Sequence, residues 1–414
     1  MTTMNSNDTI LNFPQMSTAE HEAIVDKYSA HNYGPLPVVI RKGEGCWVED
    51  VEGKKYIDML GGYSALNFGH CHPYITKVFT HQAQKLTLTA RAFQNEQFSL
   101  FCKEITEFCG YDKVLPMNSG AEAVETALKT ARKWAYKVKG VPDGKAEIIT
   151  CAHNFHGRTI SIVSFSTSEQ ARDGFGPFTP GFKTIPYADT DALEAAITPN
   201  TAAFLVEPIQ GEGGIRIPPE GYLKKCREIC TKNNILMIDD EIQAGFGRPG
   251  KKFAIDYDGV RGDLMILGKA LGGGMMPVSA VLGNDEVMGV FHPGDHGSTF
   301  GGNPLACAVA RAAMKVLIDE NLIERAAELG PPFTERIRQL NSPAIKEVRG
   351  RGLWIGIEIN PSHGDAHDYV LKLLDEGILS KETLQSVLRL APPLIITQDE
   401  LDWAFERIAK VFAR

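Results

Sequence analysis

The chain has 414 residues, of which 43% are hydrophobic and 23% are charged, a composition typical of globular proteins and a length that allows two domains. Its formal net charge is −8 and its lysines and arginines are spread along the sequence, so we expect neither a nucleic-acid partner nor a membrane partner. The eight cysteines include no C-x-x-C pair, which argues against a disulfide framework or a zinc ribbon. No apolar stretch approaches the ~20 residues that span a bilayer, and neither a secretory signal nor an arginine-rich transit peptide is visible. These features predict a cytoplasmic protein.

The predicted elements fall into an N-terminal segment (1–63), a large domain (64–320) and a smaller C-terminal domain (321–414). Residues 45–53 of the first segment look like a hairpin with Glu52-Gly53 at its turn. From about residue 98 to 300, short apolar runs alternate with helical patterns, which predicts an α/β fold with a mostly parallel sheet sandwiched by helices. The clearest strands are 147–151, 203–206, 235–238 and 264–267.

Two helices of the large domain carry clear start signals. Apolar residues recur every three or four positions from Ala121 to Ala135, and Ser119 with Glu122 forms a capping-box pattern in front of them. The second helix starts at Asn303-Pro304, with the asparagine as its cap, and runs toward Asp319.

The C-terminal part has the pattern of a small α+β domain. Alternating apolar residues predict a half-buried strand over 353–359. It is followed by a helix (366–376), a strand (387–390) and a final helix with a capping box at Thr397 and Glu400.

Three of the predicted strands run directly into polar side chains. Because ligands bind at the carboxyl ends of parallel strands, we expect these side chains to meet at one edge of the sheet. Lys269 would be partly desolvated there, as an amine nucleophile must be, although a solvated loop lysine is the simpler alternative. A carboxylate one strand away is what the ring nitrogen of pyridoxal phosphate requires. The side chains at this edge are Glu207, Glu212, Asp239, Asp240, Gln243 and Lys269.

Two further motifs suit a phosphorylated, flat ligand. Ser119-Gly120-Ala121 at a helix start offers free backbone amides for a phosphate, and simple N-capping is the alternative. Phe155 could stack on a flat ring and Arg158 could bind a carboxylate; otherwise they are a core aromatic residue and a surface cation.

Two motifs are set aside. Gly245-Phe-Gly-Arg-Pro-Gly250 spells G-x-G-x-x-G but does not directly follow a strand, and its proline disfavours a helix start, so a dinucleotide site is not expected. His70-Cys-His72 resembles metal ligands, but adjacent residues splay apart and no partner motif lies near, so we predict a structural turn and no metal site.

Taken together, six motifs in order resemble the class III, fold-type I aminotransferases that depend on pyridoxal phosphate. The resemblance extends from about Tyr28 to the last helix. It implies a large domain with a mostly parallel sheet and a smaller α+β C-terminal domain. The motifs are Asn118-Ser-Gly-Ala-Glu122, Phe155-His-Gly-Arg-Thr159, Val206-Glu-Pro-Ile-Gln-Gly-Glu212, Asp240-Glu-Ile-Gln243, Leu267-Gly-Lys-Ala-Leu-Gly-Gly273 and Gly297-Ser-Thr-Phe-Gly-Gly-Asn-Pro304.

The resemblance implies a role for each cofactor-binding position. Lys269 would hold the cofactor as a Schiff base and move the proton, and Asp240 would hold the ring nitrogen. Gln243 would contact the phenolic oxygen and Phe155 would cover the ring. The phosphate would be held by the group Ser119, Gly120 and Ala121, together with Thr299 of the second subunit, which makes the active unit a homodimer.

Within that class the substrate positions resemble those of ornithine aminotransferases, which move the δ-amino group of L-ornithine to 2-oxoglutarate. Tyr33 and Tyr63 would recognise the α-amino and α-carboxylate end of ornithine. Glu212 would pair with Arg389 while ornithine is bound and release it for 2-oxoglutarate, whose distal carboxylate Arg158 would bind.

Three alternatives remain open from the sequence. The same class includes aminotransferases for N-acetylornithine, 4-aminobutyrate and other ω-amines. An aminomutase would need no oxoacid and hence no switchable Arg389. A binding module without turnover would need neither the proton carrier Lys269 nor the carboxylate-binding arginines, and their presence argues against it.

Overall fold

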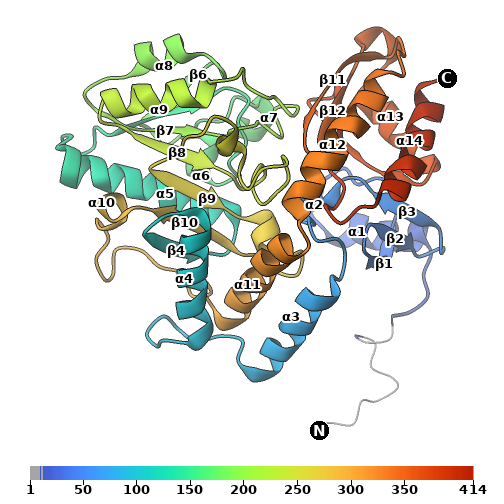
Figure 1. Ribbon diagram of the computed structural model, residues 1–414, viewed down its shortest axis with the longest axis horizontal. Coiled ribbons are helices and arrows are strands. Elements are labelled where there is room, and N and C mark those ends of the chain that lie inside the picture. The colour runs from blue at the N-terminus through green and yellow to red at the C-terminus, as the bar shows by residue number, and fades with distance from the viewer. Residues whose placement is uncertain (1–9, 11–12, 414) are drawn as a thin grey trace.

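The computed structural model describes residues 10 and 13–413, which form a large lobe and a smaller lobe (Figure 1). The large lobe is built on a seven-stranded sheet in the order β4-β10-β9-β8-β7-β5-β6. β10 is antiparallel to both of its neighbours, and the other pairings are parallel, so the expected mostly parallel sheet is confirmed. The strands are β4 (Lys113–Met117), β5 (Glu147–Cys151), β6 (Phe182–Ile185), β7 (Thr201–Val206), β8 (Leu236–Asp240), β9 (Leu264–Leu267) and β10 (Ser279–Gly283).

Helices cover both faces of this sheet, so its strands are buried on both sides. Successive residues of a strand enter different cores: Ile148 belongs to the apolar cluster that includes α5 (Gly120–Trp134), whereas Ile149 belongs to the larger cluster on the opposite face. The capping box predicted at Ser119 is present and starts α5. The other α-helices of the lobe are α3 (Pro73–Lys85), α4 (Glu96–Cys109), α6 (Ile160–Val163), α7 (Glu169–Arg172), α8 (Thr190–Ala196), α9 (Tyr222–Lys232), α10 (Asp285–Met288) and α11 (Pro304–Asp319).

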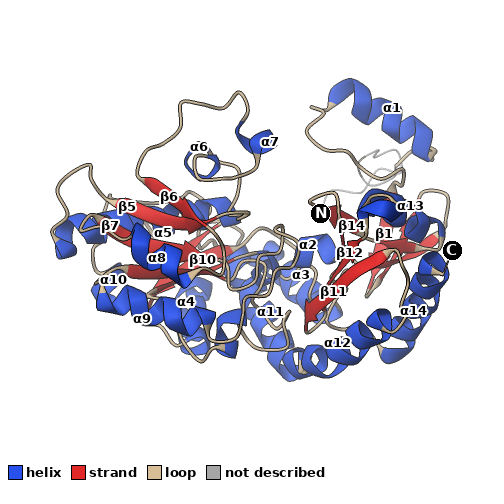
Figure 2. Ribbon diagram, turned by 90° about the horizontal axis from the view of Figure 1, so that it is seen from above, coloured by secondary structure: helices blue, strands red, loops and turns tan. Residues whose placement is uncertain are grey.

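The smaller lobe contains a four-stranded antiparallel sheet, β11-β12-β15-β14, packed with three helices (Figure 2). The expectation that residues 353–359 form a half-buried strand is wrong in one respect, because β12 is buried on both faces. A Cβ at Gly356 would lie 3.4 Å from Ile215, so a segment of the large lobe covers the second face. The elements are β11 (Ile345–Arg351), β12 (Trp354–Ile359), β14 (Lys381–Thr383), β15 (Val387–Leu390), α12 (Leu322–Arg338), α13 (Ala366–Asp375) and α14 (Gln398–Phe412).

The N-terminal segment shares a third sheet with the C-terminal part of the chain. β1 (Ile40–Glu44), β2 (Trp47–Asp50) and β3 (Lys55–Asp58) form an antiparallel ladder, and β13 (Ile378–Leu379) adds in parallel to β3. α1 (Thr18–Tyr28) has no buried residue and stands apart from the sheets in Figure 2. The division of the chain into three domains stays a prediction.

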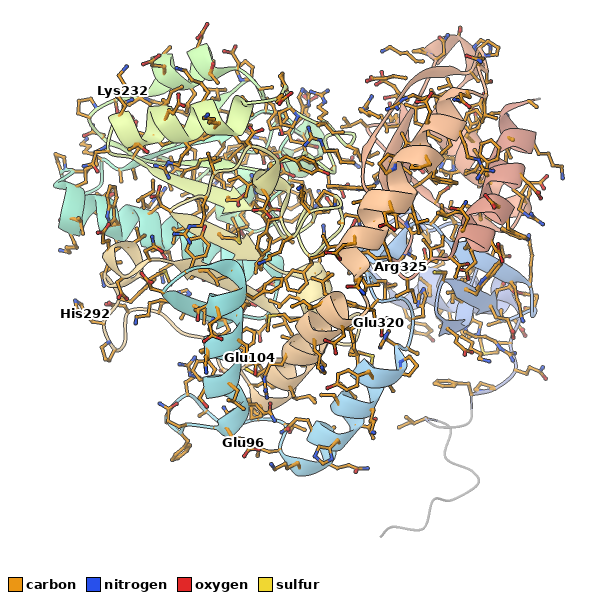
Figure 3. The ribbon with its side chains drawn as sticks, viewed as in Figure 1. Glu96, Glu104, Lys232, His292, Glu320 and Arg325 are labelled. Carbon is orange, nitrogen blue, oxygen red and sulfur yellow. The ribbon has the colours of Figure 1, made fainter. Side chains whose placement is uncertain are left out.

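Side-chain contacts stabilise each lobe on its own side of the point where α11 gives way to α12, near Glu320 and Arg325 in Figure 3. His72 contacts the Glu320 carboxylate at 3.0 Å, and Arg325 donates to the carbonyl oxygen of Ile396 at 2.7 Å. His70 contacts a different carboxylate, that of Asp58, at 2.8 Å, so the two histidines of the His-Cys-His motif serve separate contacts. Within residues 10 and 13–413 there is no group of His, Cys, Asp and Glu suited to a metal ion, and no helix of the length and apolar character needed to cross a bilayer.

Candidate active site

The carboxyl edge of the large sheet encloses a cavity of about 200 Å³. β5, β7, β8 and β9 end here, and the first turn of α5 closes one side. Six residues predicted for the cofactor line this cavity, and they come from four separate segments. The lining residues used below are Gly120, Ala121, Phe155, His156, Glu207, Asp240, Gln243 and Lys269.

Lys269 follows β9 and opens a short 3₁₀ turn, with a positive φ of 45°. A Cβ at Gly268 would lie 3.3 Å from the Ile242 side chain, so the bare backbone allows the close approach. Burial lowers the pKa of the Lys269 amine from 10.5 to about 8, against the opposing charges of Glu212, Asp240 and Glu207. Part of the amine is therefore neutral near physiological pH, as a nucleophile or proton acceptor must be.

Asp240 ends β8 and points into the cavity beside His156. Its Oδ2 lies 2.6 Å from His156 Nδ1, and both side chains are buried. Burial alone would lower the pKa of His156, but the hydrogen bond and charge of Asp240 outweigh it and raise that pKa. The two groups therefore form a buried hydrogen-bonded pair next to the cavity, in which the Asp240 carboxyl favours the charged form of His156.

Glu207 is a buried carboxyl of the cavity wall with a different character from Asp240. Burial raises its pKa to about 8, and its Oε2 accepts the Phe155 amide at 3.2 Å. The sequence placed Glu207 at this edge of the sheet.

His156 is a site residue to which the sequence assigned no role. The position of His156 directly after Phe155 was the available signal, but sequence spacing alone could not pair His156 with Asp240.

The amino end of α5 supplies backbone amides to the cavity wall at Gly120 and Ala121. The first amides of a helix have no partner within it and favour an anion. A Cβ at Gly120 would lie 3.1 Å from Ile242, so a larger residue would narrow the cavity. Ser119 is exposed, and its hydroxyl accepts the Glu122 amide at 3.2 Å, so the side chain caps the helix.

Thr299 is not brought into the cavity by its own chain. It is exposed on the loop before α11, next to Ser298, whose hydroxyl accepts the Asn118 side-chain amide at 2.8 Å. The loop therefore lies against the segment that leads into α5 while Thr299 faces outward.

A second group of predicted residues lies beside Lys269. Arg389 of β15 forms an ion pair with Glu212, and its guanidinium lies 5.0 Å from the centre of the Tyr63 ring. Gln243 donates to the Tyr63 carbonyl at 3.2 Å and approaches Glu212 at 3.4 Å. Burial would raise the pKa of Glu212, but the charges of Arg389 and Lys269 together with hydrogen bonds lower it, so the carboxylate is ionised.

Tyr63 reaches this position through a left-handed turn at residues 61–64. The four residues have φ values of 57°, 55°, 58° and 69°. Two of them, Tyr63 and Ser64, are not glycine, so the turn stores about 1–2 kcal/mol of strain for each. Asp58 Oδ1 accepts the amides of Leu60 and Gly61 at 2.9 Å and fixes the start of the turn.

A second cavity of about 490 Å³ shares Phe155 and His156 with the first. Arg158 lines it, exposed and 5.7 Å from the Phe155 ring centre, and the β14–β15 turn closes its far side. From that turn Thr383 donates to the Glu212 carbonyl at 2.6 Å, a contact that no sequence motif signalled. Tyr33 lies apart from this cavity lining and is 79% exposed.

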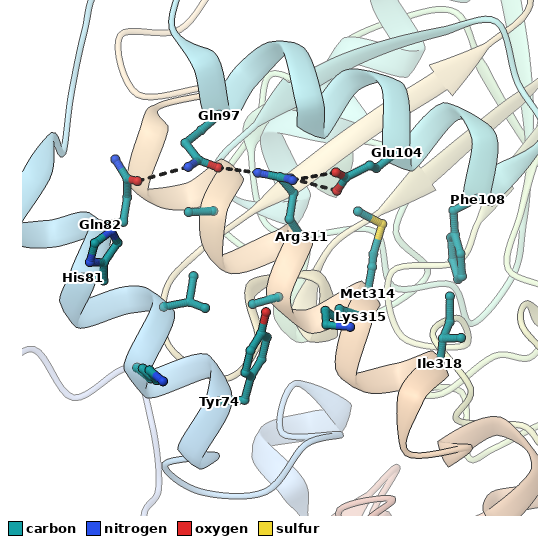
Figure 4. Close-up of a pocket in the computed structure, with 14 residues that line it drawn as sticks. Tyr74, His81, Gln82, Gln97, Glu104, Phe108, Arg311, Met314, Lys315 and Ile318 are labelled. Atoms are coloured by element: carbon teal, nitrogen blue, oxygen red, sulfur yellow. Dashed lines mark hydrogen bonds and ion pairs between the residues drawn. The ribbon is translucent and has the colours of Figure 1, made fainter.

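A groove of about 570 Å³ between α3, α4 and α11 contains none of the predicted site residues (Figure 4). There Arg311 spans Glu104 and Gln97, whose side chains point toward one another in Figure 4. Lys269 does not line this groove, so we do not assign the reaction to it.

The donor set around Lys269 fits pyridoxal phosphate. An ionised carboxylate suits the protonated ring nitrogen, a poorly solvated amine suits the aldehyde carbon, and free helix amides suit the phosphate. Glycine at position 120 leaves the space beside Ile242 open.

Sequence comparison identifies the family to which the chain is similar. The profile of the aminotransferase class-III family matches residues 28–412. An ornithine aminotransferase of Geobacillus sp. (strain WCH70) is 58% identical over 96% of this chain and 99% of its own length, and one of Bacillus subtilis is 55% identical over 95% and 98%.

Solved structures resemble the whole chain. The ornithine aminotransferase of Toxoplasma gondii, crystallised with oxidised glutathione and with pyridoxal phosphate partly occupying its active site, has a TM-score of 0.97 at 48% identity, over 99% of this chain and 98% of that one. An acetylornithine aminotransferase of Elizabethkingia anophelis has a TM-score of 0.87, also at 48% identity, over 96% and 99%.

Proposed function

Because the chain belongs to the class III aminotransferases, which depend on pyridoxal phosphate, we propose that its site moves the δ-amino group of L-ornithine to 2-oxoglutarate. The products are glutamate 5-semialdehyde, which cyclises, and L-glutamate. The observation that carries this assignment is the group Tyr63, Glu212 and Arg389 beside Lys269, since it offers a substrate both an anion and a cation close to the reacting lysine.

Pyridoxal phosphate, when bound, accepts the amino group and withdraws electrons from the carbon that loses a proton. Lys269 takes that proton and returns it, and its lowered pKa suits both directions. Asp240, supported by His156, supplies negative charge for the ring nitrogen. Gly120 and Ala121 would bind the phosphate through their amides, with Ser119 capping the helix. Phe155 would cover the ring and Gln243 would contact its phenolic oxygen.

The substrate residues divide by charge. In the ornithine half-reaction Glu212 keeps Arg389 neutralised, so the arginine does not repel the cationic donor, while Tyr33 and Tyr63 bind the α-amino and α-carboxylate end. In the 2-oxoglutarate half-reaction Glu212 turns away and Arg389 binds a carboxylate, and Arg158 binds the distal one. The backbone of Glu212 stays fixed by Thr383 while its side chain turns.

The rival donor is N-acetyl-L-ornithine, and the likeness to the Elizabethkingia anophelis acetylornithine enzyme gives it weight. The test follows the cofactor spectrum of the purified enzyme with each donor and no oxoacid. Rapid conversion to the pyridoxamine form with ornithine alone supports the proposal. Preference for the acetylated donor would overturn the roles of Tyr33 and Tyr63 but keep that of Lys269.

Glu212→Ala tests the charge switch directly. The variant should keep or improve the half-reaction with 2-oxoglutarate, because Arg389 is then always available to a carboxylate. It should lose preference for the δ-amino group and accept α-amino donors such as L-glutamate more readily. Unchanged donor preference, measured as the ratio of kcat/KM for ornithine and glutamate, would refute the switch.

The active unit that we propose is a homodimer in which Thr299 serves the neighbouring subunit's phosphate. Thr299, Phe300 (54% exposed), Phe93 (69% exposed) and Tyr33 all face outward in the single chain, and exposed aromatic residues are typical of interfaces. Mixing inactive Lys269→Ala and weakened Thr299→Ala subunits should restore activity, because one of the two hybrid sites has both residues. No recovery in a mixed dimer verified by mass spectrometry would refute the shared site.

A further inference from the structure

Arg248 lies in the Gly245–Gly250 motif, which was set aside as a dinucleotide site, and its side chain is fully buried. Its guanidinium joins three segments that are distant in the sequence. Its Nη1 donates to the carbonyl oxygens of Leu353, at 2.9 Å, and Pro392, and its Nη2 donates to Asn67 Oδ1. The side chain is 0% exposed. One planar group therefore connects the segment after α2 (Gly61–Ser64), the turn before β12 and the segment after β15.

Two of these segments carry substrate residues. Asn67 lies four residues after Tyr63, and Pro392 lies three residues after Arg389. The same two segments are joined by backbone hydrogen bonds, from the Ala391 amide to the Met59 carbonyl at 2.6 Å and from the Leu394 amide to the Asn67 carbonyl at 2.7 Å.

The contact between the segments is too close for side chains at its centre. A Cβ at Gly61 would lie 2.5 Å from the Ala391 carbonyl oxygen, so only glycine fits there. The Asn67 side chain also donates to the Phe246 carbonyl at 2.8 Å, two residues before Arg248. The junction is therefore a closed network that spans both lobes.

The charge of Arg248 is costly to bury, because all three of its hydrogen-bond acceptors are neutral. Burial lowers the pKa of Arg248 to about 9, and the charge of Asp58 acts against this. Asp58 is the residue that starts the left-handed turn of Tyr63. A lysine at this position would keep the charge. Its single ammonium nitrogen, however, cannot donate to all the acceptors that the two terminal nitrogens of the planar guanidinium reach.

We propose that Arg248 is a positioning residue that holds Tyr63 and Arg389 at a fixed separation and so sets how the enzyme recognises the α end of its donor. This rests on the proposed function for the identity of the donor. The network itself is independent of the substrate, because every contact in it lies within the protein.

Hydrogen exchange of Arg248→Lys tests the network without activity. The Ala391 and Leu394 amides should exchange about tenfold faster or more, while strands β7, β8 and β9 keep their protection. Asn67→Ala, which removes one acceptor and keeps the arginine, should show the same pattern if Arg248→Lys folds poorly. The matched control is Arg132→Lys, because Arg132 also donates to a carbonyl oxygen, that of Pro180. Unchanged exchange at both amides, or a uniform loss of protection, overturns the proposal.

Kinetics then test the link to recognition. In the wild-type background Arg248→Lys should lower kcat/KM for ornithine by about 10²-fold, the size expected for a misplacement of about 1 Å. In a Tyr63→Ala background the same change should cost less, because only Arg389 is then left to be positioned. Equal losses in both backgrounds would overturn the role of Arg248 in positioning Tyr63. If wild-type enzyme does not convert ornithine, the proposed function fails, and hydrogen exchange alone decides for or against the network.

Discussion

Replacing Lys269 with methionine should stabilise the protein when no cofactor is bound. Burial lowers the pKa of the amine from 10.5 to about 8, so charging it costs more in the folded state than in the unfolded chain. At about 1.36 kcal/mol for each pKa unit, that difference corresponds to about 3 kcal/mol. Methionine has a similar length and no charge, but Glu212 loses one nearby cation. We therefore expect a gain of about 1 to 3 kcal/mol in the free energy of unfolding at neutral pH.

The pH dependence of that gain follows from the two pKa values. Below about pH 8 the lysine is charged in both states and the penalty is complete, whereas above 10.5 it is neutral in both and the penalty is absent. The advantage of Lys269→Met should therefore be constant at low pH and shrink as pH rises from about 8 to 10.5.

Urea unfolding of the two apoproteins at several pH values measures this difference, provided the slope m is unchanged. Lys224→Met is the control, because Lys224 is exposed on α9 and its loss should change stability by less than about 0.5 kcal/mol. An apoprotein that is no more stable than wild type at neutral pH, or whose advantage persists at the highest pH, would contradict the reasoning.

Two further variants test neighbouring contacts. In Asp240→Asn the pKa of His156 should fall below about 6.5, because burial then acts without the opposing carboxylate; NMR titration of the ring would show this, and an unchanged pKa would refute this pairing. Thr383→Val removes the 2.6 Å hydrogen bond to the Glu212 carbonyl and should lower kcat/KM for ornithine about fivefold, as expected for about 1 kcal/mol; an unaltered value would show that this contact does not fix Glu212.

The sequence predicted best the features that depend on local pattern. The four strands of the parallel sheet and the caps at Ser119, Asn303 and Thr397 follow from periodicity and from side chains that satisfy helix amides, and all are present. The cavity around Lys269 also followed, because the carboxyl ends of parallel strands meet at one edge.

The features that the sequence did not predict depend on contacts between distant segments. The pairing of His156 with Asp240 joins residues 84 positions apart, and the contact of Thr383 with Glu212 joins residues 171 positions apart. β12 alternates like a half-exposed strand, yet residues near Ile215 cover its second face. No local spacing encodes such contacts, so the geometry of Tyr63 and Arg389 required the structure.

The pairing of β3 with β13 affects how the protein can form during synthesis. Residues 55–58 leave the ribosome early, whereas their parallel neighbour, Ile378–Leu379, follows after more than three hundred further residues. The large lobe can close its sheet before then, but the N-terminal strands must wait with one edge unpaired. Contacts of such long sequence separation slow folding, so we expect this sheet to be the last to form and the part of the nascent chain most prone to mispairing.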